Sequence, residues 1–224
     1  MNETLKKYIS KIPFTGDDLV EKIDAFEKAK VPLDELLEES RPMEDAMNSL
    51  TSFLYSAQRY VEHKKDELDP RCDKFYMMPA ELSYEVAEQE FHHAKAQLQK
   101  SINIGKHYEP TKWKIAKKMD KIDYGYIRNG VLLADLSDRT VNAYKKETES
   151  VLKSMKRVVD RYRAREEKAR KPYTPHRDAL IGQAAKTAIA AGVVGYVSTV
   201  AIGTLGLGAK ATAVVKAAKK VFVG

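Results

Sequence analysis

The sequence predicts an all-α protein: an elongated bundle of long, coiled-coil-like helices, followed by a C-terminal hydrophobic segment that interacts with a membrane. Glycine and proline are sparse, with 11 and 8 in 224 residues, and this favours long helices over sheet folds. Apolar residues recur every three or four positions over long stretches, which is the spacing of one helix face. Residues 187–209 contain no charged side chain, although 32% of the chain is charged.

Residues 1–40 are predicted to form short helices, over about 1–12, 17–30 and 32–40. The first two carry apolar stripes at helical spacing: Leu5, Tyr8, Ile9 and Ile12, then Leu19, Ile23 and Phe26. Pro13 and Gly16 separate the first two helices, and Pro32 begins the third, which ends near Ser40.

Residues 41–171 are predicted to form the long-helix bundle, with helices over about 41–68, 80–107, 110–128 and from 131 or 138 to 171. Ser40 is the expected N-cap of the first, and Asn129-Gly130 breaks the chain before the last. Each helix carries a narrow apolar seam, which suits helices that cross at shallow angles. The seams are Met43, Met47, Leu50, Leu54, Ala57 and Val61; Tyr84, Ala87, Phe91, Ala94, Leu98 and Ile102; Ile115, Met119, Ile122 and Tyr126; and Val141, Tyr144, Thr148, Val151, Met155, Val158 and Tyr162.

Pro172 and Pro175 are expected to end the last helix, so that 172–178 is a short, stiff linker. Residues 179–224 then form a hydrophobic segment rich in glycine, alanine and valine, with a basic tail. As a helix, the uncharged residues 187–209 would extend about 34 Å, enough to cross a hydrocarbon core of roughly 30 Å. A span, a hairpin and burial within an oligomer are all compatible with this composition.

The residues expected to enter the membrane are the larger apolar side chains of this segment: Ile189, Val193, Val194, Tyr196, Val197, Val200, Ile202, Leu205 and Leu207. The net charge of +7 is concentrated just before it, because residues 153–177 hold ten basic side chains against three acidic ones. An anionic leaflet attracts such a run by about 1 kcal/mol per Lys or Arg. The expected lipid contacts are Arg161, Arg163, Arg165, Lys168, Arg170, Lys171 and Arg177, together with Lys210, Lys216, Lys219 and Lys220 of the tail.

No catalytic residue, metal ligand or cofactor is predicted. Cys72 is the single cysteine, which excludes an internal disulfide and favours a reducing compartment. Glu90 and His93 have the spacing of two metal ligands on a helix, but a di-iron bundle needs a second such pair, which the sequence lacks. The glycine-rich stretch 203–212 departs from the phosphate-loop pattern, because Ala209 separates Gly208 from Lys210.

These observations predict a non-enzymatic, membrane-associated helical scaffold. It docks on anionic lipid through its basic helix end and inserts the apolar segment, with the bundle in a reducing, cytoplasmic-type compartment. Membrane lipid and further copies of the chain are the expected partners. The alternatives are a pore-forming or translocation protein, a virion-type assembly protein whose glycine-rich tail packs between subunits, and, less favoured, a basic helical protein that binds nucleic acid.

Overall fold

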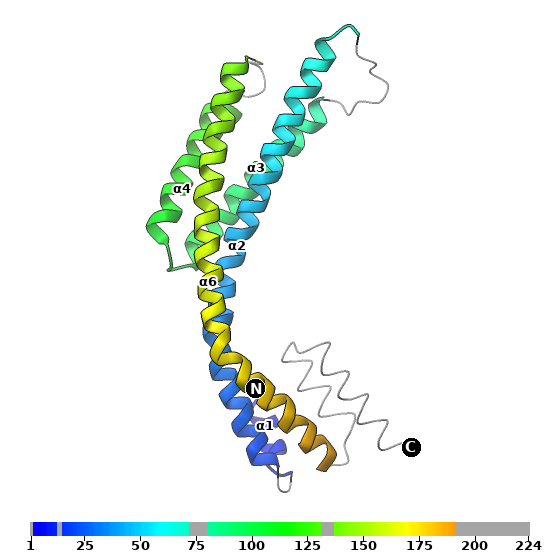
Figure 1. The fold of residues 1–224 in the computed structure, drawn as a ribbon, viewed down its shortest axis with the longest axis vertical. Helices are drawn as coiled ribbons and strands as arrows, with labels where there is room; N and C mark the ends of the chain where they lie inside the picture. The colour runs from blue at the N-terminus through cyan, green and yellow to red at the C-terminus, as the bar shows by residue number, and fades with distance from the viewer. Residues whose placement is uncertain (1, 13–14, 72–79, 131–136, 191–224) are drawn as a thin grey trace. The chain divides into compact units, whose positions relative to one another are not determined.

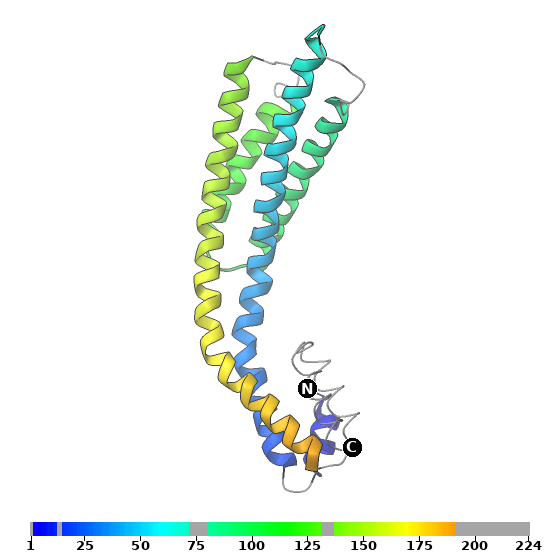
Figure 2. The same cartoon turned by 45° about the vertical axis from the view of Figure 1, so that its right-hand side comes forward.

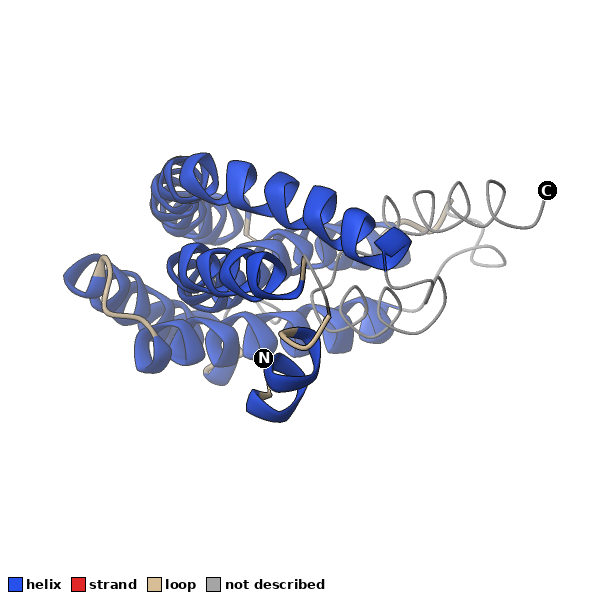
Figure 3. Ribbon diagram, turned by 90° about the horizontal axis from the view of Figure 1, so that it is seen from below, coloured by secondary structure: helices blue, strands red, loops and turns tan. Residues whose placement is uncertain are grey.

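The computed structural model describes residues 2–12, 15–71, 80–130 and 137–190, and these residues form helices and short turns with no strand. The all-α prediction is thereby confirmed (Figures 1 and 3). In chain order the elements are α1 (Glu3–Ile9), α2 (Gly16–Leu68), α3 (Ala80–Ile104), α4 (Glu109–Ile122), the π-helix η2 (Asp123–Arg128) and α6 (Asp138–Ala190).

The chain divides into two compact units, and α2 and α6 contribute residues to both. One unit is Glu35–Glu166, and the other combines Met1–Asp34 with Glu167–Gly224. The first unit contains α3, α4 and η2, whereas α1 belongs to the second. Each unit has buried residues of its own and is described separately below.

In the unit Glu35–Glu166, the described parts of α2, α3, α4 and α6 form an antiparallel helical bundle. Neighbouring helices run in opposite directions, because their contacts pair ascending with descending residue numbers. Between α2 and α6 these contacts are Glu44 with Arg163, Phe53 with Tyr144, and Lys65 with Asp138. The same opposition holds between α2 and α3, between α3 and α4, and between the consecutive elements α4 and η2 and helix α6. Figures 1 and 2 both show α4 beside α6.

The core of this bundle is apolar and rich in aromatic rings. Phe53 contacts Phe91 with ring centroids 5.0 Å apart and Tyr144 at 5.6 Å, both in edge-to-face geometry. Such pairs add about 0.5–1.5 kcal/mol to the effect of burial. All the seam residues predicted for the four helices are buried except Met47, Leu54, Tyr84, Tyr126 and Val141, which are half-buried.

Residues 16–68 form one continuous helix, so the predicted breaks at Pro32 and near Ser40 are wrong. Proline lacks a backbone N–H, but its φ angle is compatible with a helix, and each proline removes one hydrogen bond. Leu33, Leu36 and Met43 are buried beside Pro32 and Pro42 of α2, at the spacing of a single helix face. Their packing keeps α2 helical where the local sequence signals predicted an end.

The predicted linker 172–178 is also helical, because α6 continues through Pro172 and Pro175 to Ala190. Its inward-facing spacing persists across the prolines, with Ala169 and Tyr173 half-buried and Leu180 buried. The end expected at residue 171 is therefore wrong. Of the two predicted starts, the structure has the later one, at Asp138.

The predicted helix over 110–128 is divided into α4 and η2. Asp123–Arg128 have the wider turn of a π-helix, an irregularity that periodicity alone does not reveal. The expected break at Asn129-Gly130 is present, and Gly130 has a φ of 65°, the left-handed conformation that glycine adopts without strain.

The second unit has a small core in which α1, the start of α2 and the end of α6 meet. It consists of Ile9, Leu19, Ile23, Phe26 and Leu180, all at most 2% exposed. Tyr173 packs against this core with its ring centroid 5.1 Å from that of Phe26. Residues 13–14 lie outside the described residues.

Candidate functional site

The predicted lipid contacts of α6 that fall in the first unit are Arg161, Arg163 and Arg165, and all three are exposed. The guanidinium groups of Arg161 and Arg165 lie over the ring of Tyr108, 5.5 and 5.1 Å from its centroid. This cation–π geometry is worth about 0.5–1 kcal/mol at an exposed site and orients both side chains. Arg163 instead pairs with Glu44, Nε to Oε1 at 3.2 Å, so its charge is partly compensated.

In the second unit, α6 carries Lys168, Arg170 and Lys171, which are exposed, and Arg177, which is half-buried. Arg177 pairs with Asp178 at 3.0 Å. The described part of α6 therefore holds the predicted basic residues in helical geometry up to the start of the uncharged segment.

The predicted membrane-inserting residues lie almost entirely outside the described residues. Ile189 belongs to α6, but its side chain is not described. The others, and the four lysines of the basic tail, fall within 191–224: Val193, Val194, Tyr196, Val197, Val200, Ile202, Leu205, Leu207, Lys210, Lys216, Lys219 and Lys220. Among the helices of the described residues, none has a stretch of the length and apolarity that crossing a membrane requires.

A buried ionic cluster lies beneath the Tyr108 ring, and the sequence did not predict it. The Glu39 carboxylate, from α2, is surrounded by hydrogen-bonding groups of three residues: Tyr162, His107 and Lys112. Its Oε1 accepts from the Tyr162 hydroxyl at 2.8 Å and from the His107 backbone N–H at 2.6 Å, and its Oε2 lies 2.6 Å from His107 Nδ1. The Lys112 ammonium lies 3.3 Å from Oε1. One carboxylate thus joins α2, α4, α6 and the turn between α3 and α4.

Lys112 is completely buried, which is rare for a lysine without an acidic partner. Its ammonium also donates to the Ser101 carbonyl at 3.0 Å, and it lies 5.4 Å from the centroid of the Tyr162 ring. Gly105 gives this group its space, because a side chain there would meet both Lys112 Nζ and the Glu39 carboxylate. The close approach explains why the turn requires a glycine at this position.

The turn itself has an unusual backbone. Tyr108 has a φ of 58°, in the left-handed region that a non-glycine residue rarely adopts. Its ring packs edge-to-face on Tyr162 at 5.1 Å, and the His107 carbonyl accepts a 3.3 Å hydrogen bond from the Tyr162 hydroxyl. These contacts hold Tyr108 where Arg161 and Arg165 stack on it.

The environment shifts the ionisation of three groups in this cluster. Burial alone would raise the pKa of the Glu39 carboxyl, but hydrogen bonds from His107 and Tyr162 and the charge of Lys112 outweigh burial and lower it. Burial lowers the pKa of Lys112, and the attraction of Glu39 opposes that shift. Burial and the hydrogen bond to Glu39 raise the pKa of the Tyr162 hydroxyl well above its ordinary range. Glu39 therefore stays ionised and saturated with donors, which suits a structural role.

The helical spacing contained a signal for this cluster. Lys112 lies three residues before Ile115 on the predicted seam of its helix, and Glu39 lies between the buried Leu36 and Met43 at the same kind of spacing. A charged residue on an apolar stripe predicts a buried pair, but its partner cannot be identified until the helices are placed.

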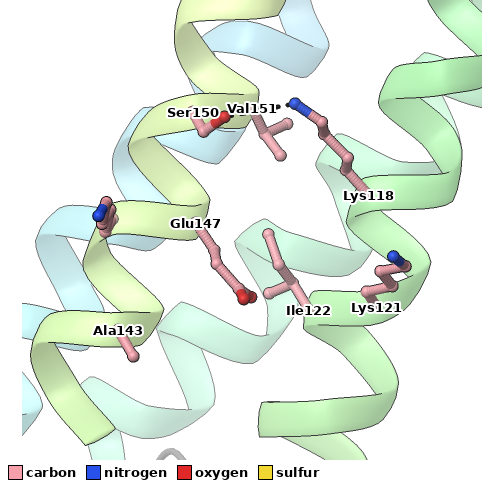
Figure 4. Close-up of a pocket in the computed structure, with 8 residues that line it drawn as sticks. Lys118, Lys121, Ile122, Ala143, Glu147, Ser150 and Val151 are labelled. Atoms are coloured by element: carbon pink, nitrogen blue, oxygen red, sulfur yellow. Dashed lines mark hydrogen bonds between the residues drawn. The ribbon is translucent and has the colours of Figure 1, made fainter. Parts of the chain in front are cut away.

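An open groove of about 490 Å³ separates α4 from α6 in the first unit (Figure 4). Ile122 and Val151, both buried, contribute apolar surface to it. Figure 4 shows the Lys118 ammonium directed toward the Ser150 hydroxyl, at 3.3 Å. The remaining lining residues are polar, charged or small: Lys121, Ala143, Lys146 and Glu147.

The Glu90/His93 pair is not joined by further metal ligands in the described part of the chain, where no group of three or more candidate ligands occurs. The His93 ring is engaged elsewhere: Nδ1 lies 2.9 Å from the Ser49 hydroxyl, and Nε2 lies 3.2 Å from the Gln97 amide nitrogen. Cys72 lies outside the described residues.

Comparison of the chain with known protein families, curated proteins and solved structures found no match.

Proposed function

We propose that this chain is a non-enzymatic, membrane-associated helical scaffold that docks on anionic lipid through α6 and inserts the uncharged segment 187–209. The observation that carries the proposal is the continuity of α6. The same helix that carries the exposed Lys168 and Lys171 extends to Ala190, into the first residues of that segment. A rigid helix between charge and apolar surface would present both to a membrane together.

Two energetic contributions act in this mechanism. Each exposed lysine near an anionic leaflet contributes about 1 kcal/mol, an attraction that salt weakens. The apolar segment contributes through transfer of its side chains out of water. Stable membrane binding generally requires two such contributions, since one weak anchor leaves binding marginal and reversible.

The test uses the full chain, because residues beyond 172 include Leu180 of the second unit's core and a truncated chain would lose it. The variant Lys168→Gln/Lys171→Gln is compared with Lys22→Gln/Lys28→Gln, which removes the same charge from exposed positions of α2. We expect the α6 variant to bind phosphatidylserine-containing vesicles about 30-fold more weakly, from roughly 2 kcal/mol of lost attraction. The control is expected to bind like the unmodified chain.

The apolar contribution is tested with Val197→Asp, near the middle of residues 187–209. A charge there costs about 2.5–3.5 kcal/mol on insertion, so association with vesicles is expected to fall even at low salt. Equal binding by all variants, or preferential binding of the unmodified chain to duplex DNA, would overturn the proposal. Release of a trapped dye would show that the bound chain forms a pore.

A further inference from the structure

α4 is a basic amphipathic helix in the first unit, and its outer face has no role in the fold described above. Its buried residues are Lys112, Ile115, Met119 and Ile122, at steps of three, four and three. Lys112 is engaged by Glu39 inside the bundle. The opposite face carries Trp113, Lys114, Lys117 and Lys121, all exposed, at the spacing of one helical face.

Aromatic side chains stand at both ends of this lysine row. Trp113, in the first turns of α4, is 46% exposed, and Tyr124, in the next turn after Lys121, is 69% exposed. One exposed apolar side chain needs no explanation, but aromatic rings flanking lysines along the consecutive elements α4 and η2 are typical of a surface that meets lipid headgroups. The lysine stems supply further apolar surface while their ammonium groups remain in water.

The charge on this face is positive and largely uncompensated. Lys114, Lys117 and Lys121 have no ion-pair partner among the described residues. The nearby Asp120 is already paired, 2.8 Å from Lys95. Lys118, at the edge of the groove between α4 and α6, donates to the Ser150 hydroxyl, which carries no charge to compensate it. The face therefore complements an anionic surface.

We infer that the outer face of α4, formed by Trp113, Lys114, Lys117 and Lys121, is a second docking surface for an anionic bilayer. This inference rests on the proposed membrane function and adds a contact that the sequence did not predict. A bilayer fits better than nucleic acid because the cations of α4 are all lysines, which attract without the planar, paired hydrogen bonds of arginine. In addition, tryptophan concentrates at the membrane interface.

The chain provides its own probe, since Trp113 is its single tryptophan. The full chain is titrated with phosphatidylcholine vesicles that contain or lack phosphatidylserine, while tryptophan emission and co-sedimentation are both recorded. We expect emission to shift to shorter wavelength only with phosphatidylserine, and to be quenched when the acyl chains are brominated. Lys114→Gln/Lys117→Gln is expected to bind about 30-fold more weakly, whereas the matched Lys22→Gln/Lys28→Gln control is unaffected.

The outcomes separate this inference from the proposed function. Co-sedimentation with unchanged tryptophan emission would overturn the α4 surface and leave docking through α6 standing. An emission shift that persists in Lys168→Gln/Lys171→Gln, with undiminished binding, would support α4 and overturn the α6 contribution. If the chain shows no vesicle binding and no emission shift, both the α4 surface and docking through α6 are overturned. A response to duplex DNA or RNA in place of vesicles would assign the outer face of α4 to nucleic acid.

Discussion

At the residue scale, Lys112 loses contact with water when the chain folds, and Glu39 supplies the negative charge that balances it. Removing two ions from water is costly, and their attraction offsets that cost only when further hydrogen bonds satisfy both groups. Here the Ser101 carbonyl, the Tyr162 hydroxyl and the His107 backbone N–H do so. The arrangement is therefore sensitive to the loss of either charge.

The variant Glu39→Gln tests this dependence. It leaves the Lys112 ammonium buried without a counter-charge, so we expect the free energy of unfolding to fall by about 3–5 kcal/mol. Urea unfolding measures it, and the exposed neighbour Glu38→Gln is the control, with an expected change within about 0.5 kcal/mol. Adding Lys112→Met to Glu39→Gln is expected to cost less than the sum of the two single changes, since the unpaired charge is then gone. Strict additivity would contradict the coupling.

The stability difference between the unmodified chain and Glu39→Gln is also expected to depend on pH. The pKa of Glu39 is lowered in the folded chain from an ordinary value of 4.5, so below about pH 4.5 the unfolded chain binds more protons. The stability that Glu39 contributes is complete above this pH and is lost as the pH falls through the lowered pKa. The difference in unfolding free energy between unmodified chain and Glu39→Gln should therefore shrink on acidification. A constant difference would be inconsistent with this assignment.

Sequence patterns located the apolar positions of the bundle better than its polar core. Leu50, Phe91 and Met155 follow from helical spacing alone, because burying one stripe of each helix is the main requirement of a bundle. The link between Glu39 and Tyr162 spans 123 positions, and it depends on how α2 and α6 are placed. No local pattern contains that placement.

At the scale of elements, the prolines of α2 and α6 predicted helix ends, but both helices continue through them. Propensity is a weak local preference, and burial on either side of a proline can outweigh the one missing hydrogen bond. Tyr173 packs on Phe26 between the two prolines of α6, and Leu180 is buried about two turns further on. The prediction failed at these positions because the packing that decides them is tertiary.

Pro172→Ala distinguishes a helix from a linker at this position. In a helix, alanine restores an N–H and is more favourable by up to about 3 kcal/mol, so we expect higher stability and helicity by urea unfolding and far-ultraviolet circular dichroism. In a linker, the same change would lower stability, because proline restricts the unfolded chain. Lys171→Ala, at an exposed position beside it, is the control and should change stability by less than about 0.5 kcal/mol.

At the scale of the whole molecule, two units with separate cores share two helices. Phe26 is fully buried in one core, and Glu39 holds together the other. Backbone continuity through α2 and α6 does not by itself make two cores unfold together, because local opening follows the contacts that each region makes. The membrane surfaces proposed above also divide between the units: Lys168 and Lys171 belong to one, and the outer face of α4 to the other.

Phe26→Ala and Glu39→Gln form a reciprocal pair that measures this independence. Deleting the Phe26 ring from a tight core costs about 3–5 kcal/mol, so amide hydrogen exchange should accelerate in α1 and in residues 16–34 and 167–190. Residues 35–166 should keep their protection in that variant and lose it in Glu39→Gln. If either change accelerates exchange equally across both units, the shared helices transmit unfolding from one core to the other, and the chain unfolds as one cooperative body.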